Sequence, residues 1–164
     1  MTVEHTAHGD VPTEPPVAAM RAAARFSKSL EVALSDVNLS LPQYRLLAFL
    51  SGGPERATAL AGWLDVSPPS LTALVDGCVA RGLVERVTSA EDRRRVLHEI
   101  TDQGHTLLKQ ADVVAAGRLA EVTSELSPAQ ARKVIEGLEL LGRALDEARA
   151  RRDAQPKTAA GAAS

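Results

Sequence analysis

The sequence predicts a mainly α-helical fold with one two-stranded β-hairpin, and three observations predict this class. Apolar residues recur every three or four positions along most of residues 17–152, which is the period of an amphipathic helix. Residues 83–104 instead contain two short runs, LVERV and VLHEI, on either side of a polar tip that reads TSAEDRRR, as in a β-hairpin. Aromatic residues are only 2% of the chain, so the core must be aliphatic, as in helical bundles.

The first two helices are predicted from apolar periodicity and a capping motif. The first runs from Val17 to Val37. The second follows Ser40, an N-cap with Gln43 at the capping-box position, and Gly52-Gly53-Pro54 ends it. The positions expected to form their apolar stripes are Met20, Ala23, Phe26, Leu30, Leu34 and Val37, then Tyr44, Leu47 and Leu50.

Two shorter helices follow, separated by a tight turn at Asp65-Val66. The third begins near Thr58, and Ser67 caps the fourth, which Gly82 ends. Prolines 68 and 69 fit the first helical positions, where an amide hydrogen has no intrahelical partner. Two helices joined by so short a turn indicate a helix-turn-helix, with the fourth helix as its recognition helix. The expected inner positions are Leu60, Ala61, Leu64, Leu71, Leu74 and Cys78.

The C-terminal part is predicted to contain two long helices. Thr101 caps the fifth helix, and Ser127 with Gln130 forms a second capping box, which starts the sixth. Their apolar stripes contain Leu108, Ala111, Val114 or Ala115, Arg118 and Val122, then Val134, Ile135, Leu138, Leu141, Leu145 and Ala148.

A helix-turn-helix followed by a basic hairpin is a winged helix, in which one helix enters the DNA major groove and the hairpin lies beside it. The hairpin tip carries Arg93, Arg94 and Arg95 after Glu91 and Asp92. A guanidinium is favoured in a narrow minor groove, and Asp92 can hold one arginine in place through an ion pair. The alternative is that the tip is a solvated turn with surface charges. The position of the hairpin directly after the helix-turn-helix favours contact with DNA.

The recognition helix itself carries few residues that read bases. Ser70 and Thr72 can bond to bases or phosphates, while Asp76 either orients an arginine or faces a cytosine amino group. The recognition helix contains no Arg, Asn or Gln before Arg81, so specificity is expected to depend partly on DNA shape. Ser67 and Ser70 could equally act as helix caps, and the two roles are compatible. The residues predicted to face DNA from this helix are Ser67, Pro69, Ser70, Thr72, Ala73 and Asp76.

The order of these motifs resembles the MarR family of bacterial transcription regulators over about residues 20–150. The matching segments are Leu41–Leu50, Ala59–Val66, Ser67–Arg86, Asp92-Arg93-Arg94 and Ile100–Gly104. The resemblance implies a winged-helix homodimer in which the first, fifth and sixth helices interlock. It also implies binding to a pseudo-palindromic operator, commonly as a repressor that a small ligand or an oxidant releases.

With this resemblance the chain divides into five parts. They are a flexible arm (residues 1–16), an N-terminal dimerisation helix (17–39), a winged helix-turn-helix domain (40–104), C-terminal dimerisation helices (105–152) and a flexible tail (153–164). Three positions depart from the family pattern. Ala73 and Gly77 stand where many relatives carry basic or polar residues, and His98 stands at a position that is usually aliphatic. No cysteine lies near the first helix, which argues against the family's oxidant-sensing mechanism.

We also expect a small-molecule effector to bind in a cavity between the dimerisation helices and the winged helix-turn-helix domain. Three aromatic rings could line such a cavity and two arginines could hold a carboxylate, although core packing and solvated surface are the alternatives. The five candidates are Arg25, Phe26, Tyr44, Arg45 and Trp63.

No metal or cofactor is expected. Cys78 lies on the inner stripe and is predicted to be a buried, inert thiol rather than a sensor. His98 and His105 have no Cys or further His nearby, so a satisfied polar group is favoured over a metal ligand for His98.

Composition bounds the remaining function classes. The formal net charge of −2 means that DNA affinity must come from a local patch, and few aromatic residues argue against single-strand binding. One cysteine, no apolar run of about 20 residues and no signal-peptide pattern predict a cytoplasmic protein. The sequence contains no Gly-rich phosphate loop and no nucleophile elbow, so an enzyme is not expected. The partners predicted are double-stranded DNA, a second copy of the chain and a small molecule. The alternative is a winged-helix dimer that grips another regulator without DNA.

Overall fold

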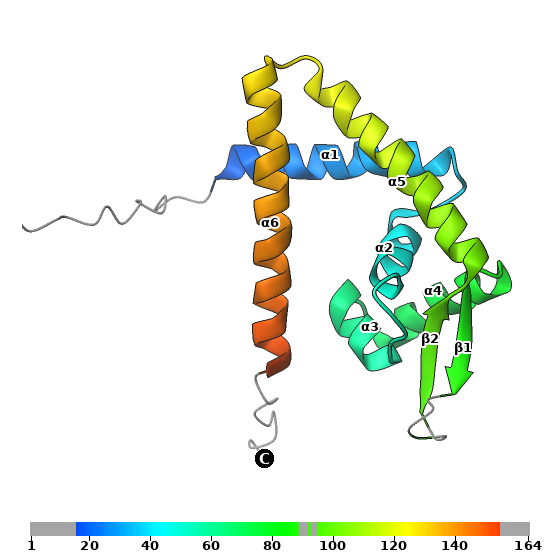
Figure 1. The fold of residues 1–164 in the computed structure, drawn as a ribbon. Coiled ribbons are helices and arrows are strands. Elements are labelled where there is room, and N and C mark those ends of the chain that lie inside the picture. The colour runs from blue at the N-terminus through cyan, green and yellow to red at the C-terminus, as the bar shows by residue number, and fades with distance from the viewer. Residues whose placement is uncertain (1–15, 89–91, 93–94, 155–164) are drawn as a thin grey trace, which may run out of the picture.

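The computed structural model describes residues 16–88, 92 and 95–154, and this part of the chain contains six helices and one two-stranded sheet. The mainly α-helical class with a β-hairpin is therefore confirmed (Figure 1). The elements are α1 (Val17–Ser35), α2 (Leu41–Leu50), α3 (Ala57–Leu64), α4 (Pro68–Ala80), β1 (Val84–Thr88), β2 (Val96–Ile100), α5 (Asp102–Thr123) and α6 (Pro128–Ala154).

Capping hydrogen bonds confirm the predicted starts of α2, α5 and α6, whereas α3 begins at Ala57 without a side-chain cap and α1 ends at Ser35 rather than at the predicted Val37. Ser40 and Gln43 form a complete capping box, in which Gln43 Oε1 accepts from the Ser40 amide at 3.0 Å. Thr101 Oγ1 accepts from the Gly104 amide at 3.0 Å. Ser127 opens α6 in the same way, because its amide donates to Gln130 Oε1 at 3.0 Å. Each cap satisfies amides that have no partner within the helix.

The sheet is an antiparallel hairpin in which Val84 pairs with Ile100 and Thr88 with Val96. A separate β-bridge joins Glu55, in the segment between α2 and α3, to His98 of β2. The bridge consists of two backbone hydrogen bonds, at 2.8 and 2.9 Å. The middle of β2 is thus joined by backbone hydrogen bonds to the segment between α2 and α3.

The core is aliphatic, as predicted, and it lies inside the winged module, where α1 and α5 cover it. Leu34 from α1 and Ala111 from α5 are fully buried. The other fully or nearly buried core residues are Leu39, Leu46, Leu47, Leu50, Leu60, Leu64, Leu71, Val75, Cys78, Leu83, Val84, Ile100 and Leu108.

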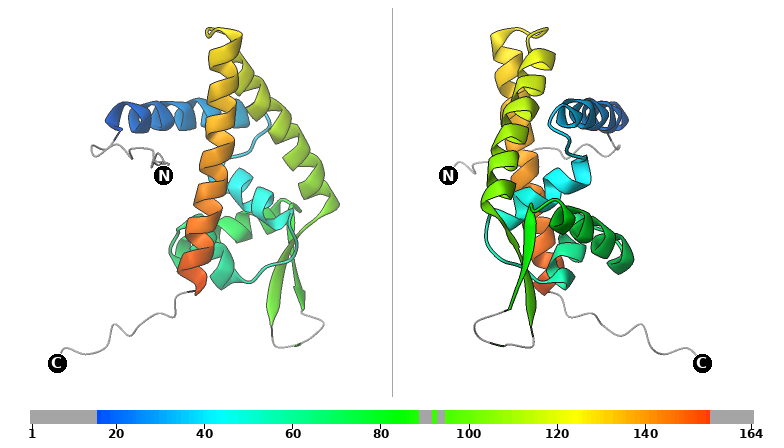
Figure 2. Two further views of the ribbon diagram at one scale, coloured as in Figure 1. Left: turned by 60° about the vertical axis from the view of Figure 1, so that its left-hand side comes forward. Right: turned by 90° about the vertical axis from the view of Figure 1, so that its right-hand side faces the viewer.

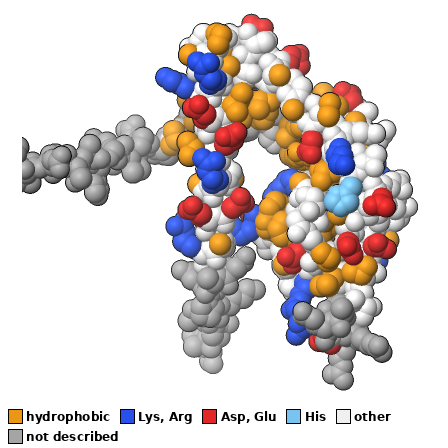
Figure 3. Space-filling model, in the orientation of Figure 1, with side chains coloured by type: hydrophobic (Ala, Val, Ile, Leu, Met, Phe, Trp, Pro, Cys, Tyr) orange, Lys and Arg blue, Asp and Glu red, His pale blue; other side chains and the backbone are white. Residues whose placement is uncertain are grey.

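Helix α6 stands largely apart from this core. It turns back after α5, crosses α1 and runs down beside the winged module (Figures 1 and 2). The space-filling view leaves an opening between α6 and the module (Figure 3). Its predicted apolar stripe is exposed within one chain: the exposed fraction is 39% at Leu138 and 58% at Leu145.

Candidate nucleic-acid interface

A tight turn between α3 and α4 builds the helix-turn-helix. Asp65 adopts the left-handed conformation, at φ 55° and ψ 50°, and the Val66 amide donates to the Ala61 carbonyl at 3.1 Å. A short polar side chain such as aspartate tolerates this region better than bulky residues. The chain reverses within three residues, and α4 begins immediately after Ser67.

Helix α4 buries one face and exposes the face predicted to meet DNA. The buried residues are Leu71, Val75 and Cys78, which are four and then three positions apart. Val75 therefore takes the place expected for Leu74, which is half-buried, because the spacing from Leu71 favours position 75. All six predicted interface residues are exposed: Ser67, Pro69, Ser70, Thr72, Ala73 and Asp76.

The hydroxyl groups at the start of α4 are hydrogen-bonded within the helix. Ser67 Oγ accepts from the Ser70 amide at 3.3 Å and lies 2.8 Å from Ser70 Oγ. Thr72 Oγ1 donates to the Pro68 carbonyl at 3.0 Å. The expected capping role of Ser67 is confirmed. Since these side chains stay exposed, capping and contact with DNA remain compatible.

Asp76 forms an ion pair with Arg86 of β1, which confirms that its carboxylate orients an arginine. The pair joins the exposed face of α4 to the hairpin. Both side chains are about half exposed, so the pair contributes little to stability and mainly fixes the position of the guanidinium. Arg86 was not among the residues predicted to meet DNA. Its alternation within LVERV was the available signal, but the facing carboxylate ten residues earlier is a tertiary contact.

At the hairpin tip, Asp92 Oδ2 lies 2.9 Å from Arg95 Nε, and the Arg95 amide donates to the Asp92 carbonyl at 2.8 Å. Asp92 therefore holds one wing arginine, as predicted. Arg93 and Arg94 lie outside the described residues. The strands extend away from the α5–α6 connection, next to α4, so that the hairpin and the recognition helix occupy one end of the molecule (Figures 1 and 2).

His98 and Cys78 lie inside the winged module behind this face. His98 Nδ1 is 3.3 Å from the Glu55 carbonyl oxygen. Burial lowers the pKa of His98, and this outweighs the opposite effects of the Glu55 hydrogen bond and the Asp76 carboxylate. Burial likewise raises the pKa of the Cys78 thiol. Both groups are held in their neutral forms at neutral pH.

Among the described residues, no group of three or more His, Cys, Asp or Glu side chains is placed to hold a metal ion. In the same part of the chain, no helix combines the length and apolar character that crossing a bilayer would require.

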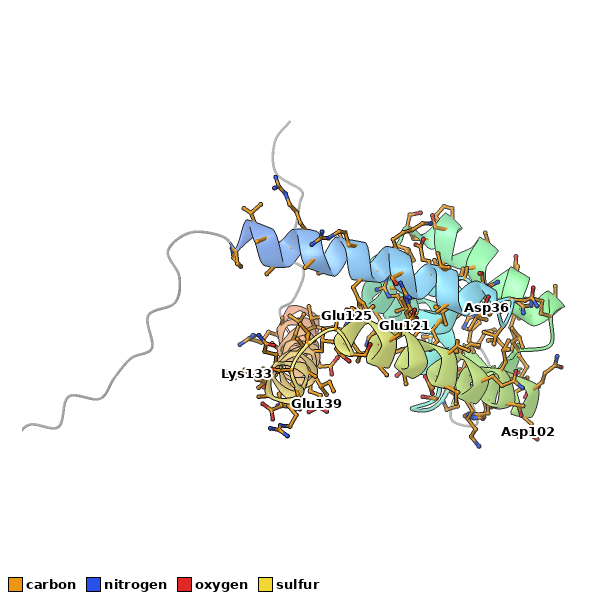
Figure 4. The ribbon with its side chains drawn as sticks, turned by 90° about the horizontal axis from the view of Figure 1, so that it is seen from above. Asp36, Asp102, Glu121, Glu125, Lys133 and Glu139 are labelled. Carbon is orange, nitrogen blue, oxygen red and sulfur yellow. The ribbon has the colours of Figure 1, made fainter. Side chains whose placement is uncertain are left out.

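The five effector candidates lie in different places. Arg25 and Phe26 line a cleft of about 350 Å³ between α1 and α5, which they share with Ser29 and Arg118. The two helices pack side by side when seen from above (Figure 4). Arg118 Nε donates to Ser29 Oγ, and its Nη1 is paired with Glu121 at 2.6 Å.

The other three candidates lie outside this cleft, and two of them form side-chain hydrogen bonds with other elements of the chain. The Tyr44 hydroxyl donates to Asp112 Oδ1 at 2.9 Å, and burial together with this carboxylate raises its pKa to about 12. Arg45 Nη2 donates to the Leu64 carbonyl at 3.3 Å. Trp63 lines a second cleft, between α3 and α6, away from Arg25 and Phe26.

These elements together define a winged helix-turn-helix protein of the DNA-binding class. A sequence model described as MarR family matches residues 37–95. The chain is 30% identical over 123 residues to the HTH-type transcriptional repressor Rv2887 of Mycobacterium tuberculosis, spanning 74% of this chain and 88% of that relative. It is also 30% identical over 114 residues to the HTH-type transcriptional regulator YfiV of Bacillus subtilis, spanning 69% of this chain and 71% of the relative. The chain belongs to the MarR family of transcription regulators.

Solved structures agree with this assignment. The MarR family protein Rv2887 of Mycobacterium tuberculosis, in complex with salicylic acid, has a TM-score of 0.65 and 27% identity, covering 80% of this chain and 99% of that one. The transcriptional repressor CouR, bound to a 23-mer DNA duplex, also has a TM-score of 0.65, with 26% identity and coverage of 85% and 99%.

Proposed function

We propose that this regulator is a homodimeric repressor of a pseudo-palindromic operator, from which a small molecule releases it. The observation that carries the DNA-binding part is the Asp76–Arg86 ion pair, because it joins the exposed face of α4 to the wing. Recognition helix and wing thus lie side by side, so that α4 can enter the major groove with the arginine tip beside it. CouR, a relative in structure, is bound to duplex DNA.

Dimerisation is proposed from the exposed apolar stripe of α6. Valine, isoleucine and leucine side chains from Val134 to Leu145 remain 39–59% exposed in one chain, and Met20 of α1 is 65% exposed. A stripe of this size is costly to leave in water, and a second copy of the same helices would cover it. A two-fold dimer would present two α4 helices to half-sites about 10 base pairs apart, or a multiple of that spacing.

The effector part of the proposal is a carboxylate-bearing aromatic molecule in the α1–α5 cleft. Arg25, Phe26 and Arg118 line this cleft, so cationic groups lie beside a ring. Rv2887, a relative, has been solved with salicylic acid. A ligand can release DNA only if it binds differently to the DNA-bound and free shapes of the dimer.

The test uses Arg94→Ala with the operator, identified by selecting bound sequences from random duplexes or from the promoter beside the protein's own gene. We expect weaker binding and a flatter dependence of log K on log salt. The slope should fall by about 2, because each lost phosphate contact contributes about 0.9 and a dimer has two wings. Arg132→Ala is the matched control, with the same loss of charge at the first turns of α6. Unchanged affinity and slope in Arg94→Ala would contradict wing docking.

The second candidate is a winged-helix dimer that binds another regulator. It is favoured by the net charge of −2 and by the lack of basic residues in α4. If the wild-type dimer ignores every duplex in dilute buffer, this alternative replaces the first.

A further inference from the structure

The C-terminal part of α6 reaches the winged module near the end of α3. The Arg149 guanidinium carbon lies 4.2 Å from the centroid of the Trp63 ring, and Arg149 Nη2 donates to the Trp63 carbonyl. The two residues are 86 positions apart, and Figures 1 and 2 show the end of α6 descending to the level of α3. Stacking and hydrogen bonding together fix the guanidinium in two directions.

Arg149 acts where α3 leaves carbonyl groups without helical partners. The last carbonyls of a helix have no intrahelical donor, and they carry the negative end of the helix dipole. At this end of α3, the Trp63 carbonyl accepts from Arg149 and the Leu64 carbonyl accepts from Arg45 of α2. Two cations therefore cap the helix at the residues that lead into the turn at Asp65.

The Trp63 ring also contacts α2. It packs against Phe49, with ring centroids 4.2 Å apart and planes tilted by 38°. The ring therefore contacts both α2 and the guanidinium from α6. Glu55 and Asp146 line the same cleft, which favours a cation at its centre.

We propose that Arg149 is a positioning residue for DNA binding: it fixes the helix-turn-helix turn, and so α4, to the dimerisation helix α6 of the same chain. The proposal rests on the DNA-binding function proposed above. The Arg149–Trp63 contact couples the position of α6 to that of the recognition helix, separately from α5 and the wing. A displacement of α6 would therefore move the turn between α3 and α4.

Trp63 is the only tryptophan in the chain, so its fluorescence reports on this contact without DNA. In Arg149→Ala we expect a shifted Trp63 emission, stronger quenching by acrylamide, and severalfold faster amide exchange in residues 61–67. Operator affinity should fall about three- to tenfold, because a cation–π contact and a hydrogen bond are lost. The salt slope should not change, since Arg149 reaches α3 and not a phosphate. Arg149→Lys keeps charge and donor and should restore part of each change.

Arg151→Ala is the matched control, because Arg151 is exposed two residues further along the same helix. It should leave emission, exchange and affinity at wild-type values. Unchanged emission and exchange in Arg149→Ala would overturn the proposal, and so would a reduced salt slope, which indicates direct contact with DNA. If the wild type binds no duplex but Arg149→Ala changes emission and exchange, the DNA-binding function fails, and with it the positioning role, while the contact itself stands.

Discussion

Gly104, in the first turn of α5, lies where that helix meets the base of the wing. A Cβ atom at this position would lie 2.7 Å from Ile100 Cγ1 and 3.1 Å from the Leu83 carbonyl carbon, with the Leu83 oxygen closer still. The Leu83 oxygen already accepts from the Thr101 amide at 3.1 Å. Backbone atoms held by this hydrogen bond cannot move aside as a side chain would, so Gly104→Ala must displace α5 or the hairpin.

The expected loss in free energy of unfolding is the difference between two opposing effects. Overpacking costs about 1–3 kcal/mol, and a clash with backbone belongs at the upper end, while alanine gains about 1 kcal/mol over glycine in a helix. The net loss in free energy of unfolding is about 2 kcal/mol, or about 4–8 °C in Tm for a chain of this size. A shift of α5 would also weaken the cap from Thr101 to the Gly104 amide.

The assay is thermal unfolding followed by circular dichroism at matched protein concentration, because the Tm of the proposed dimer would depend on concentration. Gly62→Ala in α3 is the control, since a Cβ there meets no atom within 4 Å. That variant should be unchanged or more stable by up to about 1 kcal/mol. If Gly104→Ala proves as stable as Gly62→Ala, the close approach between α5 and the wing is wrong.

The remaining predictions concern the two buried titratable groups. Burial holds the pKa of His98 below its usual 6.5, so the unfolded chain takes up a proton first as the pH falls, and stability declines below about pH 7. His98→Leu should remove that part of the decline in denaturant melts between pH 8 and 5, and equal slopes would refute the assignment. Because burial raises the pKa of Cys78, its thiol should react with a disulfide reagent at pH 8 far more slowly in the native protein than in denaturant. Equal rates would show that the thiol is accessible.

The sequence by itself determined the order of the elements and most of their ends, although α1 ends two residues before the predicted Val37. Capping pairs such as Ser40 with Gln43, and Thr101 with Gly104, lie three residues apart, so local chemistry fixes them wherever the helix packs. The hairpin and the helix-turn-helix are likewise patterns of neighbouring residues. Those patterns were enough to predict the winged module and its exposed recognition face.

Only the tertiary structure decided which side chains meet across elements. Asp76 meets Arg86, Arg149 meets Trp63, and Gly104 touches the wing, although no spacing in the sequence indicates these partners. Such contacts depend on how helices cross and how far a long side chain reaches, to within a fraction of an ångström. Periodicity states which face of a helix is apolar, but it carries no information about the distance or angle at which another element approaches.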